Sequence, residues 1–370
     1  MTELMVSLRR KLKVKNIKEK EFNKILIIRL SGMGDVIYTL PLLSALRSKY
    51  GSKHIAWLVS SKAKDVVAGH PLIDEVIVFE REKGIVGAIK AIKELRKRKY
   101  DLVLDPQSQL RSGLFAFLGA IPVRMGFARG VSKEPGFIFM NERVSPLGNE
   151  RHNVDRDLGF ARHLGIERGR VEFNLKIETA DSKFADSYLA ESGVKKNEKL
   201  VGFSIACSMQ NRKWSNKNWA QLNNEIALKE NIRTVILWGP GEEQDMKAII
   251  SLSKERALSA PKTNIKQLAA IIKKCSLVIG NDSGPLHLAA ALGIPVICLC
   301  GPTDPEITGP YGNGNISIRK NLTVLPCYVS EKNSSRCKKF RSCLEKTCIE
   351  LITVKDVVSA FKRITNEYGG

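Results

Sequence analysis

Apolar stretches rich in β-branched residues alternate with helix-forming stretches along this chain of 370 residues, in two successive series. Strands that alternate with helices form parallel sheets covered by helices. The expected strands lie at residues 24–30, 55–59, 75–79, 102–105, 201–205, 234–238, 276–279 and 295–300. The pattern therefore predicts an α/β fold of two Rossmann-like domains, joined near residues 170–180, with a cleft between them.

The stretch Gly280–Pro295 (GNDSGPLHLAAALGIP) has the pattern of a strand that runs into a helix through a tight polar turn. Asp282 or Ser283 is expected to cap this helix, with Pro285 at its first position. Backbone N–H groups and the positive end of the helix dipole meet at such a turn, which makes it a site for a phosphate or diphosphate. His287 adds a donor in the first helical turn. An ordinary capped helix explains the pattern about equally well.

The strand at 24–30 ends in Ser31-Gly32-Met33-Gly34-Asp35. Its glycines let the backbone approach a ligand, and the Asp35 carboxylate stands at the carboxyl edge of the sheet, where a general base meets a substrate hydroxyl. A plain turn with Asp35 as a helix cap is the competing interpretation, since the third glycine of a dinucleotide motif is missing.

Two loops of the second series carry charges after a strand. Ser208, Arg212 and Lys213 follow the strand at 201–205, and a hydroxyl with two cations suits a diphosphate. Glu242 and Glu243 follow the strand at 234–238, and carboxylates in that position accept hydrogen bonds from ribose hydroxyls. A solvated basic loop and acidic residues at a helix N-terminus are the alternatives.

The formal net charge of +22 indicates a polyanionic partner, although a solvated lysine-rich surface is the simpler explanation. The basic segment Met1–Phe22 suits adsorption to a membrane surface, and a disordered tail is equally open. Few aromatic residues and no recognised reading module argue against nucleic acid. No apolar run is long enough to span a bilayer and no signal peptide is visible, so a cytoplasmic location is expected.

Four of the eight cysteines cluster near the C-terminus, at Cys327, Cys337, Cys343 and Cys348. Their spacing matches no standard paired zinc motif, and a disulfide framework is unexpected in a cytosolic chain. Reduced thiols are the first interpretation, with a structural metal site as the alternative.

Several motifs, in the same order, resemble those of the ADP-heptose glycosyltransferases of glycosyltransferase family 9, which build the inner core of lipopolysaccharide. The motifs are SGMGDV, RKW, NDSGPLHLAAALG, GPTDP and TGPYG, and with HNVDR at 152–156 they look most like the heptosyltransferase I branch. The resemblance covers about residues 23–365. It implies a GT-B fold, with a basic extension at 1–22, an acceptor domain at 23–172, a donor domain at 173–350, and a last helix within 351–370 that crosses back to the first domain.

The resemblance also implies roles for single residues. Asp35 matches the carboxylate proposed as the base that activates the acceptor. The implied donor-binding residues are Ser208, Arg212, Lys213, Glu243, Asp282, Ser283, Gly284 and His287, with Glu242 as the neighbour that substitutes for Glu243. The family's lysine falls on Arg212, so which of the two cations contacts the donor stays open.

The implied reaction is the inverting transfer of heptose from ADP-heptose to an anionic, Kdo-bearing lipid A acceptor, with no metal or other cofactor. Candidate acceptor contacts are Ser31, Gly32, Met33, Gly34, Arg111, Arg124 and Arg129, although solvated surface is the stronger interpretation for the arginines. The protein is expected at the cytoplasmic face of the inner membrane of a Gram-negative-type bacterium. A transferase with another nucleotide sugar or a protein acceptor, and a non-catalytic sugar-nucleotide or lipid-binding protein, are the alternatives.

Overall fold

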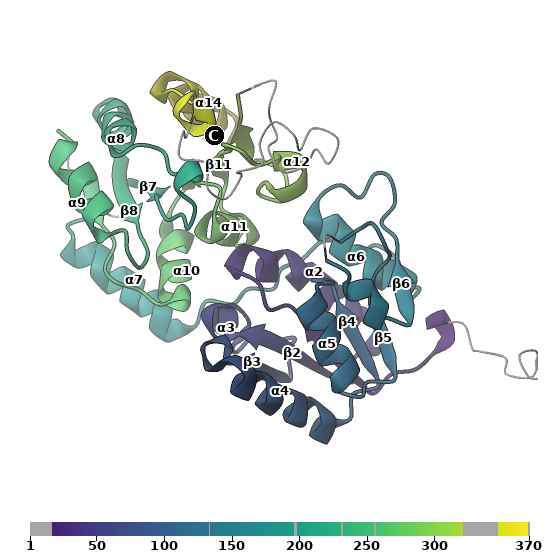
Figure 1. The fold of residues 1–370 in the computed structure, drawn as a ribbon. Coiled ribbons are helices and arrows are strands. Elements are labelled where there is room, and N and C mark those ends of the chain that lie inside the picture. The colour runs from purple at the N-terminus through teal and green to yellow at the C-terminus, as the bar shows by residue number, and fades with distance from the viewer. Residues whose placement is uncertain are drawn as a thin grey trace, which may run out of the picture.

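The computed structural model describes residues 17–132, 134–195, 198–230, 232–254, 257–320 and 347–368. Within them the chain forms two six-stranded sheets whose strands all pair in parallel (Figure 1). The first sheet has the order β3-β2-β1-β4-β5-β6, with bounds Glu75–Phe79, His54–Ser60, Lys24–Ile28, Leu102–Asp105, Val123–Phe127 and Glu142–Val144. The second has the order β12-β11-β10-β7-β8-β9, with bounds Ile316–Ile318, Val296–Leu299, Leu277–Asn281, Lys199–Ser204, Ile232–Leu237 and Ala257–Ser259.

The first sheet is buried on both faces, which is why its strands are apolar throughout rather than alternating. Ile25 and Ile27 of β1 face a core that includes α2 (Met33–Tyr50) and α6 (Asn153–His163). Leu26 and Ile28 face the opposite core. That core is covered by α4 (Gly84–Arg98) and α5 (Leu110–Leu118).

The second sheet is covered in the same way. One face packs against α8 (Asn216–Glu230), α9 (Glu243–Leu252) and α14 (Val354–Tyr368). The other face packs against α7 (Thr179–Glu191), α10 (Ile265–Lys274) and α11 (Gly284–Ala291), in the same hydrophobic core as α2. Helix α11 lies directly against α2, so the two domains meet where the turn before α11 approaches the loop after β1.

The structure confirms the predicted parallel α/β domains, but some elements differ from the expectation. Helix α2 begins at Met33, three residues before the predicted start, so Asp35 lies inside the first helical turn. The sequence pattern missed β5, β6, β9 and β12, of which three are only three residues long and pair at or next to a sheet edge. It also missed α7, which begins the second domain.

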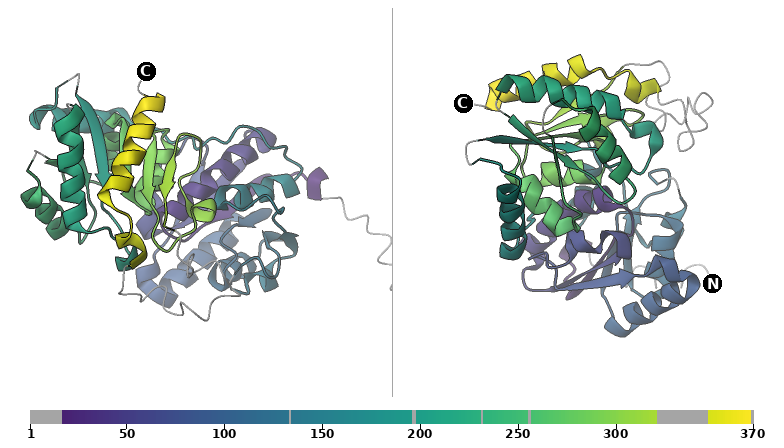
Figure 2. Two further views of the ribbon diagram at one scale, coloured as in Figure 1. Left: turned by 90° about the horizontal axis from the view of Figure 1, so that it is seen from above. Right: turned by 90° about the vertical axis from the view of Figure 1, so that its left-hand side faces the viewer.

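The last helix does not cross back to the first domain as the family resemblance implied. The apolar residues Val354, Val357, Phe361 and Ile364 form one stripe of α14, at spacings of three and four. This stripe is buried in the core of the second domain, against α8, the edge strand β12 and its neighbour β11. Both views of Figure 2 show the yellow helix lying on the second domain. No helix among the described residues is long and apolar enough to cross a membrane.

Candidate active site

A cleft of about 600 Å³ opens between the two domains at the carboxyl ends of both sheets. The first domain contributes the turn at the start of α2, and the second contributes the loops after β7, β8 and β10. The charged and polar lining residues include Asp35, Tyr38, Ser208, Arg212, Glu242, Asn264, Asp282, Ser283 and His287. The structure therefore brings most of the predicted donor residues and the predicted base into one cavity.

Asp35 is the third residue of α2, which begins after the capping residue Gly32. In the first turn the helix dipole stabilises its negative charge. Its side chain is 43% exposed, and its nearest cation is Arg29, with Arg29 Nη2 at 3.6 Å from Asp35 Oδ1. Asp35 is thus held at one side by Arg29 and open to the cleft, as a base that meets a substrate hydroxyl must be.

Two glycines allow the two domains to touch beside Asp35. A Cβ atom on Gly34 would stand 3.0 Å from Cδ2 of His287, and one on Gly284 would stand 2.9 Å from Cβ of Met33. Any larger residue would therefore push the α2 turn and the α11 turn apart. Gly34 and Gly284 thus allow the backbones of the two domains to approach each other closely.

The turn before α11 holds a buried carboxylate between two potential cations. Asp282 Oδ2 lies 3.3 Å from Arg212 Nη1, and its Oδ1 lies 3.1 Å from His287 Nε2. Burial alone would raise the pKa of Asp282, but the His287 hydrogen bond and the His287 and Arg212 charges hold it below its ordinary value. Asp282 therefore fixes Arg212 and His287 in place rather than exchanging protons.

Ser283 is the N-cap of α11, and Pro285 occupies the second helical position. The Ser283 side chain does not cap the helix, and its buried hydroxyl has no hydrogen-bond partner within the described residues. Because this hydroxyl lines the cleft at the positive end of the helix, it is placed to donate to an anionic ligand.

The two adjacent glutamates after β8 have different surroundings. Glu242 is buried, lines the cleft, and accepts hydrogen bonds from the backbone N–H groups of Cys207 at 2.7 Å and Gly239 at 2.9 Å. Glu243 is exposed, pairs with Lys247 at 2.7 Å, and is not among the residues that line the cleft. The structure thus places the neighbour, Glu242, where the resemblance expected Glu243.

The two cations of the loop after β7, Arg212 and Lys213, also point to different surroundings. Arg212 lines the cleft, whereas Lys213 Nζ lies 3.1 Å from Asp245 and 3.7 Å from Glu242, outside the lining residues. Of these two cations, Arg212 is therefore the one that faces the cleft.

Tyr38, which the sequence analysis did not single out, joins the domains at this point. Its hydroxyl donates to the Thr308 carbonyl at 2.5 Å and lies 3.0 Å from His287 Nε2. The same hydroxyl lies 3.2 Å from His287 Nδ1, so it sits against both nitrogens of the imidazole ring. His152 packs on the Tyr38 ring, with ring centroids 5.4 Å apart, and its Nε2 bonds the Gly309 carbonyl at 2.9 Å. Through these contacts α2, the helix that carries Asp35, packs against the first turn of α11.

A second hollow of about 310 Å³ lies on the other side of Asp35, wholly within the first domain. Its lining includes Arg29, Ser31, Gln107, Gln109, Arg156 and Asp157. Asp35 lines both cavities, so its carboxylate stands between the cleft and this hollow, which we call the acceptor hollow after the role predicted for the first domain. Arg29 and Arg156 are the cations that this hollow offers to an anion.

The arginines proposed from sequence lie elsewhere. Arg111 lines an apolar groove on the outer face of the first domain. Arg124 donates from Nε to the Phe139 carbonyl and from Nη1 to the Ile121 carbonyl, both at 2.7 Å. Arg129 is exposed and lines neither the cleft nor the acceptor hollow.

Asp157, in the acceptor hollow, makes stability depend on pH. Burial raises its pKa to about 6 from an ordinary 3.8, against the opposing effects of Arg29 and of the Thr39 hydrogen bond. Because the folded state binds this proton more tightly than the unfolded state does, the protonated carboxyl stabilises the fold. This contribution of about 3 kcal/mol is fully present when pH is below 3.8, and it is lost as pH rises through about 6.

We therefore expect Asp157→Asn, which keeps a partner for Thr39, to gain unfolding free energy relative to the wild type as pH rises from about 5 to about 8. Urea unfolding at the two pH values measures the difference. A difference between the two proteins that does not change with pH would contradict the raised pKa.

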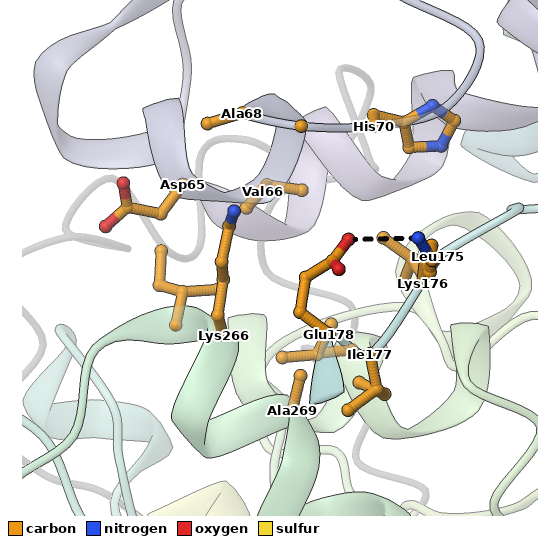
Figure 3. Close-up of a pocket in the computed structure, with 13 residues that line it drawn as sticks. Asp65, Val66, Ala68, His70, Leu175, Lys176, Ile177, Glu178, Lys266 and Ala269 are labelled. Carbon is orange, nitrogen blue, oxygen red and sulfur yellow. Dashed lines mark ion pairs between the residues drawn. The ribbon is translucent and has the colours of Figure 1, made fainter. Parts of the chain in front are cut away.

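A much smaller cavity, of about 40 Å³, lies where α3 (Lys64–Val67) and the interdomain linker meet α10. Figure 3 shows its charged residues: Lys176 pairs with Glu178 at 3.4 Å, and Lys266 extends toward α3. It holds room for only a few waters.

The structure describes only Cys348 of the four late cysteines, and it is buried. Cys327, Cys337 and Cys343 lie outside the described residues, as does most of the basic segment at 1–22. In the part of the chain that is described, no group of three or more His, Cys, Asp or Glu side chains is arranged to hold a metal ion.

Comparisons with known proteins agree with this geometry. The profile of glycosyltransferase family 9 (heptosyltransferase) matches residues 88–338. The chain is 29% identical to the lipopolysaccharide core heptosyltransferase OpsX of Haemophilus influenzae, over 78% of this chain and 81% of that protein. It is 30% identical to lipopolysaccharide heptosyltransferase 1 of Campylobacter coli, over 76% of this chain and 84% of that protein.

Solved structures confirm the predicted GT-B fold. A family 9 glycosyltransferase of Veillonella parvula superposes with a TM-score of 0.82 at 23% identity, over 94% of this chain and 99% of that one. The heptosyltransferase WaaC of E. coli, solved with ADP, superposes with a TM-score of 0.72 at 22% identity, over 92% of this chain and 99% of that one. With the profile spanning more than half of its length, the chain belongs to glycosyltransferase family 9 and is a glycosyltransferase.

Proposed function

We propose that the protein transfers heptose from ADP-heptose to an anionic, Kdo-bearing lipid A acceptor, with inversion at the anomeric carbon and without a metal or other cofactor. The observation that carries the proposal is Asp35, which lines both the interdomain cleft and the acceptor hollow. The relatives named lipopolysaccharide heptosyltransferases support heptose as the sugar and lipopolysaccharide core as the product.

In this mechanism the donor lies in the cleft with its diphosphate at the Ser283–His287 turn. Asp35 accepts the proton of the acceptor hydroxyl while that oxygen attacks the anomeric carbon from the opposite side to the diphosphate. The bond from the sugar to ADP breaks, and negative charge grows on the leaving diphosphate. Arg212, the Ser283 hydroxyl and the N–H groups of the helix start stabilise this charge. Asp282 already holds Arg212 in place, the helix holds its own N–H groups, and within the described residues the Ser283 hydroxyl has its proton free to donate.

The acceptor is placed by the first domain. Arg29 and Arg156 in the acceptor hollow supply positive charge for an acceptor carboxylate or phosphate. The loop of Ser31, Gly32, Met33 and Gly34 stands between the hollow and the cleft, where the two substrates would meet. We propose that the enzyme works at the cytoplasmic face of the inner membrane of a Gram-negative-type bacterium, because its acceptor is anchored there.

Calorimetric titration with ADP, GDP and UDP tests the donor half of the proposal. ADP is expected to bind at least about tenfold more tightly than GDP and UDP. A site that hydrogen-bonds adenine would lose some of those bonds with guanine or uracil in its place. Tighter binding of GDP or UDP would favour a family 9 enzyme with another nucleotide sugar. Binding of ADP-heptose with no turnover on any acceptor would favour a non-catalytic protein.

Substitution of the two glutamates tests the position of the nucleotide. Glu242→Gln is expected to raise the Kd for ADP about tenfold, because a carboxylate that orders the loops after β7 and β8 is lost. Glu243→Gln is the matched control and is expected to bind ADP as the wild type does, since its side chain faces solvent and Lys247. A larger effect of Glu243→Gln would contradict this assignment.

A further inference from the structure

An apolar surface on the first domain has no role in the reaction described above. Eleven large apolar side chains among the described residues are strongly exposed, and seven of them lie on α4, α5 and the short helix η4 (Gly136–Phe139). These seven, which we call the α4–α5 face, are Ile85, Val86 and Ile89 of α4, Leu110, Leu114 and Phe117 of α5, and Ile138 of η4. Ile85 and Val86 are 78% and 71% exposed, so they gain almost nothing from the fold itself.

Side chains from both helices of the α4–α5 face meet in one groove. Ile85 and Leu114 line a common groove of about 310 Å³ with Ile92 and Phe115. Phe117 stacks on Phe139, with ring centroids 5.7 Å apart, which extends the surface to η4. Helices α4 and α5 lie on the outer face of the first sheet, away from the second domain (Figure 1). Single exposed apolar residues are ordinary, but a continuous apolar surface marks a binding site.

The surroundings of this face are basic. Residues 80–99 contain eight basic and three acidic residues, and each of the three acidic side chains has a partner. Glu80 pairs with Lys83 and Lys90, Glu94 pairs with Arg98, and Glu82 accepts from Ser61. Lys93, Lys97 and Arg111 are exposed around the apolar centre. An apolar centre with a cationic rim complements the surface of a bilayer that contains anionic lipids.

The position of the face suits a lipid substrate. The groove lies at the beginnings of α4 and α5, which is the carboxyl edge of the first sheet and the edge that carries Asp35. Gln109, the N-cap of α5, lines the acceptor hollow, and Arg111, two residues further, lines the apolar groove. A sugar bound in the hollow is therefore close to whatever the face contacts.

We propose that the α4–α5 face adsorbs to an anionic phospholipid bilayer and presents the acceptor hollow to the membrane. The inference extends the proposed function, because it names the surface that brings a lipid-anchored acceptor to Asp35. It differs from adsorption through the basic segment Met1–Phe22, which needs no apolar surface on the domain.

Vesicle binding by the full chain, without donor or acceptor, tests the inference. The doubly substituted Ile85→Glu/Ile89→Glu protein is expected to bind vesicles of phosphatidylglycerol and phosphatidylethanolamine at least about tenfold more weakly than the wild type. Leu252→Glu is the matched control, because Leu252 is 54% exposed on α9 of the second domain, and its binding is expected to be unchanged. The wild type is expected to bind phosphatidylcholine vesicles weakly.

Three results would overturn the inference. Unchanged vesicle binding by Ile85→Glu/Ile89→Glu is the first. The second is loss of binding only when the basic residues of Met1–Phe22 are replaced. The third is a change from dimer to monomer in the doubly substituted protein with no change in vesicle binding, which would assign the face to a second copy of the chain.

Activity separates this inference from the proposed function. The doubly substituted protein is expected to act normally on a water-soluble, deacylated acceptor and poorly on the same acceptor in vesicles. Vesicle binding that depends on Ile85 and Ile89 in a protein without heptosyltransferase activity would support the face and refute the proposed function. Normal turnover on vesicles by the doubly substituted protein would support the proposed function and refute the role of the α4–α5 face.

Discussion

Replacing Asp35 by alanine is expected to lower kcat about a thousandfold while the Kd for ADP-heptose stays within about twofold. General-base catalysis is expected to be lost because, among the described residues, Asp35 is the one carboxylate that lines both the cleft and the acceptor hollow. Binding is expected to be retained because the proposed donor contacts, Arg212 and the turn at Ser283, belong to the second domain. Initial rates and calorimetric titration of the same preparations measure the two effects.

Asp35→Asn provides a control with nearly the same volume and no basic oxygen. Both variants are expected to unfold at the wild-type temperature, since Asp35 is 43% exposed and its one ion pair, with Arg29, spans 3.6 Å. Turnover close to that of the wild type in either variant would show that another group accepts the acceptor proton.

Arg212→Ala is expected to lower kcat about a hundredfold, because a fixed cation is lost from the place where charge grows on the leaving diphosphate. Lys213→Ala is the matched control: the neighbouring side chain is directed to Asp245 and is expected to change kcat less than about threefold. Steady-state kinetics on the two variants decides which cation serves the donor, a question that the sequence leaves open.

Removal of Arg212 also leaves the buried Asp282 with one cationic neighbour fewer, so thermal unfolding must accompany the kinetics. Arg212→Lys keeps the charge and serves as the second variant, with an intermediate kcat expected because an ammonium cannot reproduce the fork of a guanidinium. An equal loss in Lys213→Ala, or full activity in a folded Arg212→Ala protein, would contradict the assignment.

The long strands and the two domains were predictable because their sequence signal is strong. A strand buried on both faces, such as β1, is a run of β-branched residues that few other structures explain. The edge strands β6, β9 and β12 have only three residues each, which is too short for any period to show. Packing against the rest of the sheet, not local preference, makes them strands.

The site was predicted in its loops and less well in its side chains. From the sequence spacing alone, either Glu242 or Glu243 could line the cleft. The folded turn decides between them, because it directs the Glu242 carboxylate to the N–H groups of Cys207 and Gly239. Tyr38 belongs to no recognisable sequence motif. Its role depends on contacts with His287 and Thr308, which lie 249 and 270 positions further along the chain. Long-range contacts of this kind leave no signal in a single sequence.

The most direct test of the account is the product of the reaction. The protein is incubated with ADP-heptose and a Kdo-bearing lipid A acceptor, and mass spectrometry and NMR follow the acceptor. We predict a gain of one heptose for each ADP released, an anomeric configuration opposite to that of the donor, and no product with Asp35→Ala. No heptosylated acceptor with the active wild-type protein, together with turnover of a different nucleotide sugar, would contradict the account.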